Sequence, residues 1–438
     1  MKWATYPDYK KSGVEWVGEV PSHWKIRQIK WGNPVRRGAS PRPIDDPKYF
    51  DDNGHWSWVR IADVSASPGR LTETRQRLSE LGSSLSVKLD PGNLFISIAG
   101  TVGKPCITDI PACIHDGFVY FPNLDIDPEY LFRIFESGEC YQGLGKFGTQ
   151  LNLNTDTVGS IRIPIPALAE QQAIVDFLKV ETAKIDELIS KQEQLITTLR
   201  EDRTATITQA VTKGLKPNVG MNDSGVEWIG AIPTGWTATA LKHLATVRDC
   251  KHLTAEFVEE GYPLASIREV QARYLDLSHA KRTTEHFYKL LIEGDRRPSP
   301  GDLIFSRNAT VGEVAQVTDN LVDFAMGQDV CMIRPQSPKV ESSFLWFTLR
   351  SQYVRRQLDM MMIGSTFKRI NVEEIRSILV ALPSETEQVT IVHFLEERCA
   401  KIDALIEKAT QVVGTLREYR SALITAAVTG KIDVRGAA

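Results

Sequence analysis

The chain has 438 residues, of which 42% are hydrophobic and 24% charged, and its formal net charge is −3. This length exceeds one ordinary domain, so two or more cores are expected, and the acidic total speaks against a basic nucleic-acid-binding domain, although binding depends on local patches. The sequence lacks a run of roughly 18 apolar residues and an apolar signal core at its start, which makes the cytoplasm the expected location.

The first part of the chain is predicted to be a short motif followed by an α+β domain. Residues 1–24 contain the motif SGVEWVGEVPSHW, from Ser12 to Trp24, and residues 25–165 form a mixed block. In this block GNLFISIAG and SIRIPIP are typical of strands, whereas DPEYLFRIFESGECYQGLG has helical periodicity.

Residues 166–212 are predicted to form one long helix. Pro166 marks its start, and Glu170 and Gln171 stand in the early turns, where the helix dipole favours a carboxylate. No Pro or Gly follows until Gly214, so the helix would span more than about 60 Å. Such length outside a membrane indicates a coiled coil.

The second half of the chain repeats this plan. Residues 213–236 are a linker that ends in SGVEWIGAIPTGW, and residues 237–382 form a second mixed block containing GDLIFSRN and SILVALP. Residues 383–438 begin with PSETEQVTIVHFLEERCAKIDALI, which matches PALAEQQAIVDFLKVETAKIDELI from the first helix. We expect an internal duplication with a pseudo-twofold arrangement.

Each long helix carries an apolar stripe with heptad spacing, which is unstable when exposed to water. Two such stripes in one chain most simply bury each other, and a twofold relation makes the helices antiparallel. The alternative is that each helix packs only on its own globular block. The predicted interface residues are Leu178, Ile185, Leu188, Leu195 and Leu199 in the first helix and Leu395, Ile402, Leu405, Val412 and Leu416 in the second.

Catalytic and metal-binding motifs are missing from the sequence. GLGKFG, residues 143–148, matches GxGxxG but follows a helix-like segment, and GTVGKP lacks the Walker spacing. NPVR, from Asn33, is not the Asn-Pro-Pro-aromatic element of an amino-methyltransferase. The six cysteines are scattered without a CxxC pair, which predicts buried reduced thiols. We therefore expect a binding protein or scaffold without catalytic residues, metal or cofactor.

Arg and Lys, interleaved with amide and hydroxyl residues, recur in loop-like segments of both blocks. Such side chains donate hydrogen bonds to phosphates and base edges, although any one of them is more often an ordinary surface charge. Their recurrence at equivalent places favours DNA binding. The predicted DNA-binding residues are Arg36, Arg37, Ser40, Arg42, Arg60, Lys104, Lys146, Gln150 and Asn152 in the first block and Arg248, Lys251, Arg268, Arg273, Arg307, Asn308, Lys368 and Arg369 in the second.

Asp63 and Glu269 also stand at matching positions, ahead of Val64 and Val270. A carboxylate there either orders a loop or accepts a hydrogen bond from a cytosine amine. Ordering of the loop is the favoured interpretation.

Together the motifs resemble the specificity (S) subunit of type I DNA restriction-modification systems over essentially the full length. The resemblance depends on SGVEW[VI]G given twice, on EQ-x-x-IV-x-FL entering both helices, on AKIDxLI within them, and on AVTKGL and AVTGKI at their ends. It implies two target recognition domains, each recognising one half of a bipartite, asymmetric site in double-stranded DNA, separated by two long helices that form an antiparallel coiled coil.

The same resemblance implies partners that carry the chemistry. Two methyltransferase (M) subunits would bind S-adenosylmethionine and methylate adenine, and restriction (R) subunits would add ATP-driven translocation and cleavage. Because M subunits would share the neutralisation of phosphates, the acidic total no longer opposes DNA binding. The helices would set the spacing of the half-sites, about one helical turn or 34–36 Å apart.

Two other functions stay open from the residues alone. A stand-alone DNA adenine methyltransferase would bind S-adenosylmethionine itself, but the Asn-Pro-Pro-aromatic element is missing. A coiled-coil adaptor for proteins would explain the helices, but it leaves the divergence of the two blocks unexplained.

Overall fold

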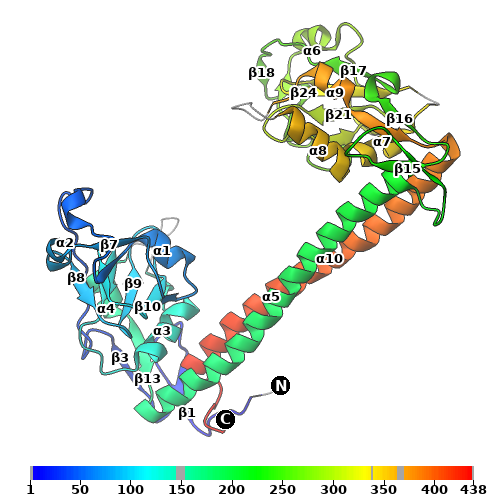
Figure 1. Ribbon diagram of the computed structural model, residues 1–438. Coiled ribbons are helices and arrows are strands. Elements are labelled where there is room, and N and C mark those ends of the chain that lie inside the picture. The colour runs from blue at the N-terminus through cyan, green and yellow to red at the C-terminus, as the bar shows by residue number, and fades with distance from the viewer. Residues whose placement is uncertain (1–2, 145–152, 337–338, 363–368, 437–438) are drawn as a thin grey trace. The chain divides into compact units, whose positions relative to one another are not determined.

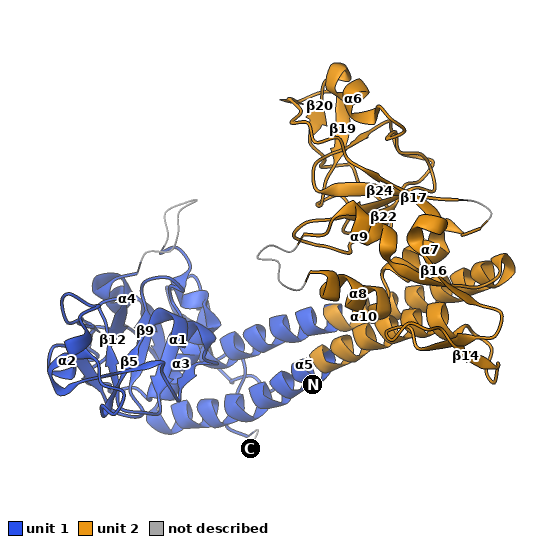
Figure 2. Cartoon of the chain, turned by 45° about the horizontal axis from the view of Figure 1, so that its top comes forward, with its two compact units in different colours: residues 1–192, 411–438 blue, residues 193–410 orange. Residues whose placement is uncertain are grey.

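The computed structural model describes residues 3–144, 153–336, 339–362 and 369–436 (Figure 1). The chain divides into two compact units: unit 1 comprises residues 1–192 and 411–438, and unit 2 comprises residues 193–410 (Figure 2). Each unit holds one globular head and about half of each long helix. Across the described residues, every helix is either too short or too polar to cross a membrane.

The head of unit 1 is built on two main sheets, with strand orders β4-β12-β9-β10-β6 and β7-β5-β11-β8, and on the two-stranded pairs β1-β2 and β13-β3. Its strands are β1 (Tyr9–Lys11), β2 (Glu19–Pro21), β3 (Lys25–Gln28), β4 (Arg36–Arg37), β5 (Trp56–Val59), β6 (Arg70–Leu71), β7 (Gln76–Leu78), β8 (Val87–Leu89), β9 (Leu94–Ser97), β10 (Pro105–Thr108), β11 (Ala112–Ile114), β12 (Phe118–Tyr120) and β13 (Arg162–Ile165). Its helices are α1 (Ile61–Ala66), α2 (Glu80–Ser84), α3 (Pro128–Ser137), α4 (Thr155–Ser160) and the 3-10 turns η1 (Pro47–Tyr49) and η2 (Glu139–Tyr141).

The head of unit 2 has the sheets β17-β24-β21-β22 and β18-β20-β19-β23 and the pairs β14-β15 and β16-β25. Its strands are β14 (Met221–Asp223), β15 (Ala231–Pro233), β16 (Thr237–Ala240), β17 (Ala245–Asp249), β18 (Phe257–Val258), β19 (Tyr262–Ala265), β20 (Arg282–Thr283), β21 (Leu303–Ser306), β22 (Val314–Gln316), β23 (Ala325–Met326), β24 (Val330–Pro335) and β25 (Leu379–Leu382). Its helices are η3 (Leu241–His243), α6 (Glu285–Ile292), α7 (Ser342–Leu349), α8 (Gln352–Met361) and α9 (Val372–Ser377).

The predicted duplication is confirmed in the strand register. In unit 1, β12 places Val119 opposite Arg37 on β4, and in unit 2, β24 places Cys331 opposite Asp249 on β17. The central strands agree as well, because β9 pairs with β12 in the same way as β21 pairs with β24. Arg37 and Asp249 therefore hold the same position in the two heads.

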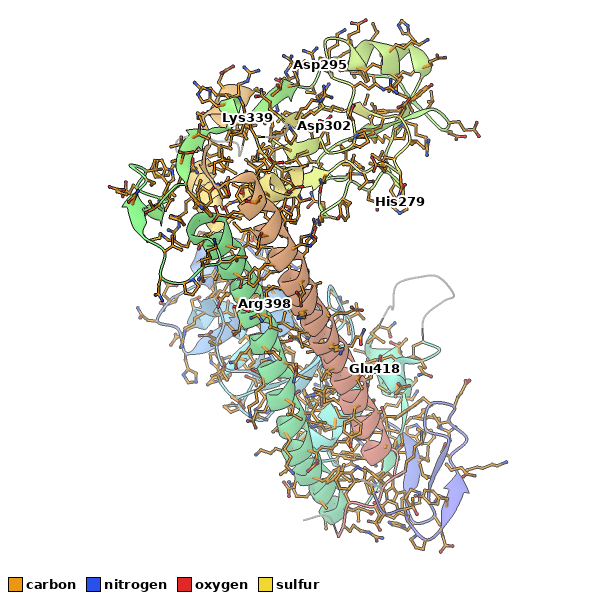
Figure 3. All side chains as sticks on the ribbon, turned by 90° about the vertical axis from the view of Figure 1, so that its right-hand side faces the viewer. His279, Asp295, Asp302, Lys339, Arg398 and Glu418 are labelled. Carbon is orange, nitrogen blue, oxygen red and sulfur yellow. The ribbon has the colours of Figure 1, made fainter. Side chains whose placement is uncertain are left out.

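The two long helices are α5 (Leu168–Lys213) and α10 (Glu385–Val428). Within unit 1, Arg420 of α10 pairs with Asp186 of α5 at 2.8 Å. Within unit 2, Arg398 of α10, labelled in Figure 3, pairs with Asp202 of α5, and the two side chains lie 3.2 Å apart. High numbers in one helix meet low numbers in the other, so the helices are antiparallel and bury each other, as predicted.

The register of the predicted stripe was wrong at four positions, because Leu188, Leu195, Leu405 and Val412 are 44–51% exposed. The side chain after each of them lies at the interface instead. At each of these places two apolar residues stand side by side, Leu-Ile three times and Val-Val once, so the sequence alone does not show which of the two faces the partner helix. Polar residues in the true stripe also interrupt the apolar spacing of three and four residues by which it would be recognised. That stripe follows positions 178, 182, 185, 189, 192, 196 and 199 in α5 and 395, 399, 402, 406, 409, 413 and 416 in α10.

The remaining predicted interface residues occupy this stripe. Leu178, Ile185, Leu395 and Ile402 are at most 5% exposed, and Leu199 and Leu416 are half-buried.

A glutamine at the start of each long helix joins it to the head of the same unit. Gln171 accepts a hydrogen bond from the backbone N–H of Asp127 at 2.9 Å, and Gln388 accepts one from Glu341 at 2.8 Å. Both glutamines are buried, with 1% of their surface exposed. Asp127 and Glu341 cap α3 and α7, so the glutamine of the repeated Glu-Gln pair fixes a head helix to a scaffold helix.

The repeated opening motif receives the C-terminal end of a long helix. In unit 2, Trp236 lies against Gly214, which ends α5, and in unit 1, Trp24 lies against Gly430, which follows α10. Both glycines have φ near +70°, the left-handed conformation that ends helices. The motif occurs twice because, in each unit, it packs against the C-terminal end of one long helix.

Candidate nucleic-acid interface

In unit 1, three of the predicted DNA-binding residues converge on Asp116, in the turn between β11 and β12. Arg42 pairs with its carboxylate at 2.9 Å, and the Ser40 hydroxyl donates to the same carboxylate at 3.0 Å. Arg37 on β4 donates from Nε to the backbone carbonyl of Asp116. Arg36, its neighbour on β4, is exposed. The strand β4 and the segment after it thus present donors beside one exposed acidic side chain.

The segments that follow β5 and β19 show what the matched carboxylates do. Asp63 accepts a hydrogen bond from the backbone N–H of exposed Arg60 at 2.9 Å. Glu269 accepts from the backbone N–H of Ser266 at 2.7 Å and from its hydroxyl at 2.6 Å. Glu269 therefore orders the turn after β19, as predicted, whereas Asp63 caps the start of α1.

Lys104 is half-buried and is bonded within its own head. Its Nζ donates to the carbonyls of Ser65 at 2.9 Å and Ser67 at 2.7 Å, at the C-terminal end of α1. Burial lowers the pKa of Lys104. The favourable contact with carbonyls at a helix C-terminus explains its position, so Lys104 supports α1, and its contact with DNA stays a prediction.

In unit 2, Arg307 requires the clearest correction. It is 3% exposed, and its guanidinium pairs with Asp249 of β17 at 2.8 Å. A buried guanidinium cannot touch a base edge without rearrangement of the head. The sequence could not show this, because the partner carboxylate stands 58 residues away. Arg307 belongs to the interior of unit 2.

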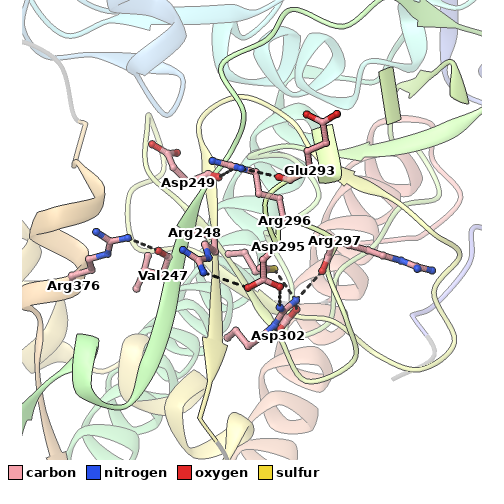
Figure 4. A network of polar contacts seen from close by, with 11 residues as sticks. Val247, Arg248, Asp249, Glu293, Asp295, Arg296, Arg297, Asp302 and Arg376 are labelled. Atoms are coloured by element: carbon pink, nitrogen blue, oxygen red, sulfur yellow. Dashed lines mark hydrogen bonds and ion pairs between the residues drawn. The ribbon is translucent and has the colours of Figure 1, made fainter. Parts of the chain in front are cut away.

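The outer side of β17 carries a second network (Figure 4). Arg248 lies 3.5 Å from Asp295, and Arg334 reaches the same carboxylate at 2.7 Å and Asp302 at 2.9 Å. Charge-assisted pairs of this kind fix the orientation of the guanidinium groups. Arg248 was predicted from the sequence, but its acidic partner was not, because that residue lies in the turn-rich segment EGDRRPSPGD, 47 residues away.

Arg273 and Lys251 are also engaged within unit 2. Arg273 pairs with Glu396 of α10 and lies over the ring of Trp346, 5.3 Å from its centroid. Lys251 pairs with Glu293 at the end of α6. Arg273 thus joins the head to the scaffold helix, and its contact with DNA stays a prediction.

The remaining predicted residues of unit 2 lie nearer the surface. Asn308 and Arg369 form an isolated bridge between two segments that are far apart in sequence. Arg369 and Arg268 are exposed, and Asn308 is half-buried. The predicted residues Lys146, Gln150, Asn152 and Lys368 lie outside the described residues.

Asp249, Cys250 and His252 bring three potential metal-ligand atoms within 4.8 Å of one another. The guanidinium of Arg307 already supplies a cation to Asp249, and it lies 3.9 Å from the Cys250 sulfur. Burial raises the pKa of the Cys250 thiol to about 11, which favours the protonated form over the thiolate that a metal needs. The geometry fits an internal ion pair better than a metal centre.

Comparison with known proteins places these heads in a known class. The family model described as the type I restriction modification DNA specificity domain matches twice, over residues 38–198 and 234–413. The chain is similar to the specificity subunit of the type I restriction enzyme MjaVIII of Methanocaldococcus jannaschii, with 24% identity over 320 residues, which cover 72% of each chain. It is also similar to the specificity subunit of StySPI from Salmonella potsdam, with 23% identity over 95% of this chain and 91% of the relative.

One solved structure has the same fold over nearly the full length. It comes from work on the complex assembly and conformational transition of the type I R-M system, and it covers 93% of this chain and 98% of its own. The TM-score is 0.72 at 16% sequence identity.

Proposed function

Because the chain belongs to the family of type I restriction-modification DNA specificity domains, we propose that it is the DNA-recognising subunit of a methyltransferase and endonuclease complex. It recognises a bipartite, asymmetric site in double-stranded DNA, one half through each head, and leaves methylation and cleavage to M and R subunits. The observation that carries this proposal is the pair of heads with matching strand register and different side chains at matched positions. A cytoplasmic location follows from this role.

In unit 1, the surface around β4 supports recognition of DNA. Arg36 and Arg60 are exposed, and Arg37 and Arg42 are held by Asp116 in fixed positions. Held guanidinium groups lose less freedom when they bind a base edge or a phosphate than free side chains do.

The exposed apolar side chains on the coiled coil support docking of a partner subunit. Leu188, Val412 and Tyr419 lie in unit 1, and Leu195 and Leu405 lie in unit 2, each 44–51% exposed. The four aliphatic residues each stand one residue before a core position, and in an antiparallel pair these positions of the two helices flank the same side. Such apolar residues, repeated in both units, suit two copies of an M subunit.

Sequencing of modified adenines tests the recognition role. The chain is expressed with its M partner in a host without other adenine methyltransferases, and the modified sites are mapped. The expected result is one motif of two specified halves separated by unspecified bases. A motif without a gap, or methylation that is independent of this chain, would contradict the proposal.

Replacing Arg36 by Ala assigns one half-site to unit 1. Discrimination should fall at one base of a single half, by about 1–3 kcal/mol, if Arg36 contacts a base edge. A uniform loss over all sequences would make it a phosphate contact instead. Lys10→Ala, an exposed charge on β1 of the same unit, serves as the matched control and should leave the motif unchanged.

Docking is tested by Leu405→Glu, with Lys408→Glu on the same helix as control. Leu405 is 51% exposed and Lys408 is exposed, so both variants should fold. Co-purification of the M subunit should be lost with Leu405→Glu alone. Equal retention of the M subunit by both variants would remove this patch from the interface.

The spacing role of the helices has its own test. One heptad is inserted into α5 at Gln192 and one into α10 at Ala409, which are both core positions of the stripe. The unspecified spacer in the mapped motif should lengthen while both halves stay the same. An unchanged spacer in a folded variant would show that the helices do not set the spacing.

A further inference from the structure

Asp116 holds a position in unit 1 that its counterpart in unit 2 does not reproduce. Its carboxylate and carbonyl accept from Arg37, Ser40 and Arg42, while its side chain stays 39% exposed. The carboxylate therefore engages two donors, from Ser40 and Arg42, and the backbone carbonyl engages Arg37. It does so at the surface, where an approaching phosphate would meet it.

The carboxylate stays ionised under ordinary conditions. Partial burial alone would raise its pKa, but the hydrogen bond from Ser40 and the charge of Arg42 hold the pKa of Asp116 below its ordinary value. A phosphate near Arg42 or Arg37 would therefore face a fixed negative charge within the screening distance of about 8–10 Å. The exocyclic amine of cytosine or adenine would meet a hydrogen-bond acceptor at the same place.

The matched position in unit 2 is neutral. Ile114 pairs with Val59 in the parallel strands β11 and β5, and Met326 pairs with Ala265 in β23 and β19. Counting two residues onward from these pairs puts Gln328 where unit 1 has Asp116. Unit 2 carries its acidic residue one position later, at Asp329, where unit 1 has Gly117.

We propose that Asp116 is a specificity-determining residue of the unit 1 head, which weakens binding to DNA phosphates at non-cognate sites and accepts a base amine at the cognate half-site. This inference depends on the proposed function. It explains how basic residues can gather on a chain of net charge −3 without making it a general DNA binder. Specificity increases because repulsion between the Asp116 carboxylate and phosphates weakens binding to every sequence that does not place a base amine beside Asp116.

The experiment compares the assembled complex containing the unaltered chain with complexes containing Asp116→Asn, Asp116→Glu and Asp46→Asn. Asp46 is the control, because it pairs with Lys48 at 2.7 Å in the same unit and none of its bonds involves a predicted DNA-binding residue. Fluorescence anisotropy measures affinity for a duplex that lacks the mapped site, at several salt concentrations. Modified adenines are mapped for each complex.

Asp116→Asn should bind the non-cognate duplex about three- to tenfold more tightly, with a salt slope steeper by about 0.9 for each phosphate gained. Its map should relax at a base of one half-site only. Asp116→Glu and Asp46→Asn should behave like the unaltered chain. Unchanged or weaker non-cognate binding by Asp116→Asn, or equal gains by Asp46→Asn, would overturn the inference. If the unaltered complex neither binds nor modifies DNA, the proposed function itself fails.

Discussion

The two heads share a backbone register but carry different chemistry at matched positions. Apolar residues that alternate toward the cores set the pairing of the central strands, and a slip by one residue would turn every side chain to the other face. Side chains that point away from the core are free to diverge. A duplicated scaffold can therefore present two surfaces that suit two half-sites. The divergent pairs, unit 1 first, are Arg37 and Asp249, Lys104 and Glu313, His115 and Gly327, and Asp116 and Gln328.

The difference extends into the interior. In unit 1 the ring of His115 lies 5.8 Å from that of Trp58, and burial lowers its pKa, which favours a neutral imidazole. Unit 2 has Gly327 and Leu264 there, which line a cavity of about 410 Å³. The two heads also place their arginines differently. Arg37 is exposed in unit 1, whereas Arg307 of unit 2 is buried against the carboxylate of Asp249.

Removing that carboxylate should have the largest effect. Asp249→Ala leaves the guanidinium of Arg307 buried without its partner, which should cost about 3 kcal/mol in the free energy of unfolding of unit 2. Arg37→Ala at the matched position of unit 1 should cost less than about 1 kcal/mol, because Arg37 is exposed. Denaturation followed by hydrogen exchange localises each loss to its unit. Equal costs would mean that the two positions differ in charge but not in burial.

The glycines at the helix ends give a smaller, graded comparison. Gly430 and Gly214 have φ values of 73° and 70°, so Ala should introduce similar backbone strain, about 1 kcal/mol or more, at both. A Cβ at Gly430 would also lie 2.4 Å from Pro21, whereas one at Gly214 would lie 3.3 Å from the Trp236 ring. Gly430→Ala should therefore lower the melting temperature more than Gly214→Ala. The reverse order would show that Pro21 and its neighbours in unit 1 move aside more easily than the Trp236 ring in unit 2.

The architecture could be predicted from the sequence because its signals are periodic or repeated. The long helices, the strands that enter them and the duplication all leave patterns that survive without knowledge of contacts. The candidate interface could not be predicted to the same depth. Arg307 and Arg248 look alike in sequence, and only contacts across many residues place one inside and the other at the surface. The partners of Lys104 and Arg273 were missed for the same reason, since they are backbone carbonyls and a distant helix.

The smallest effect tests the corrected register of the coiled coil with two identical residues. Val413 is 6% exposed at a core position, and Val412 beside it is 44% exposed. Val413→Ala should cost about 1–2 kcal/mol in stability, and Val412→Ala should stay within about 0.5 kcal/mol. Thermal denaturation of the two variants measures the difference without any change of residue type. If Val412 proved the costlier site, the interface would follow the sequence-predicted stripe, and the exposed side chains assigned to partner docking would belong to the interior of the pair.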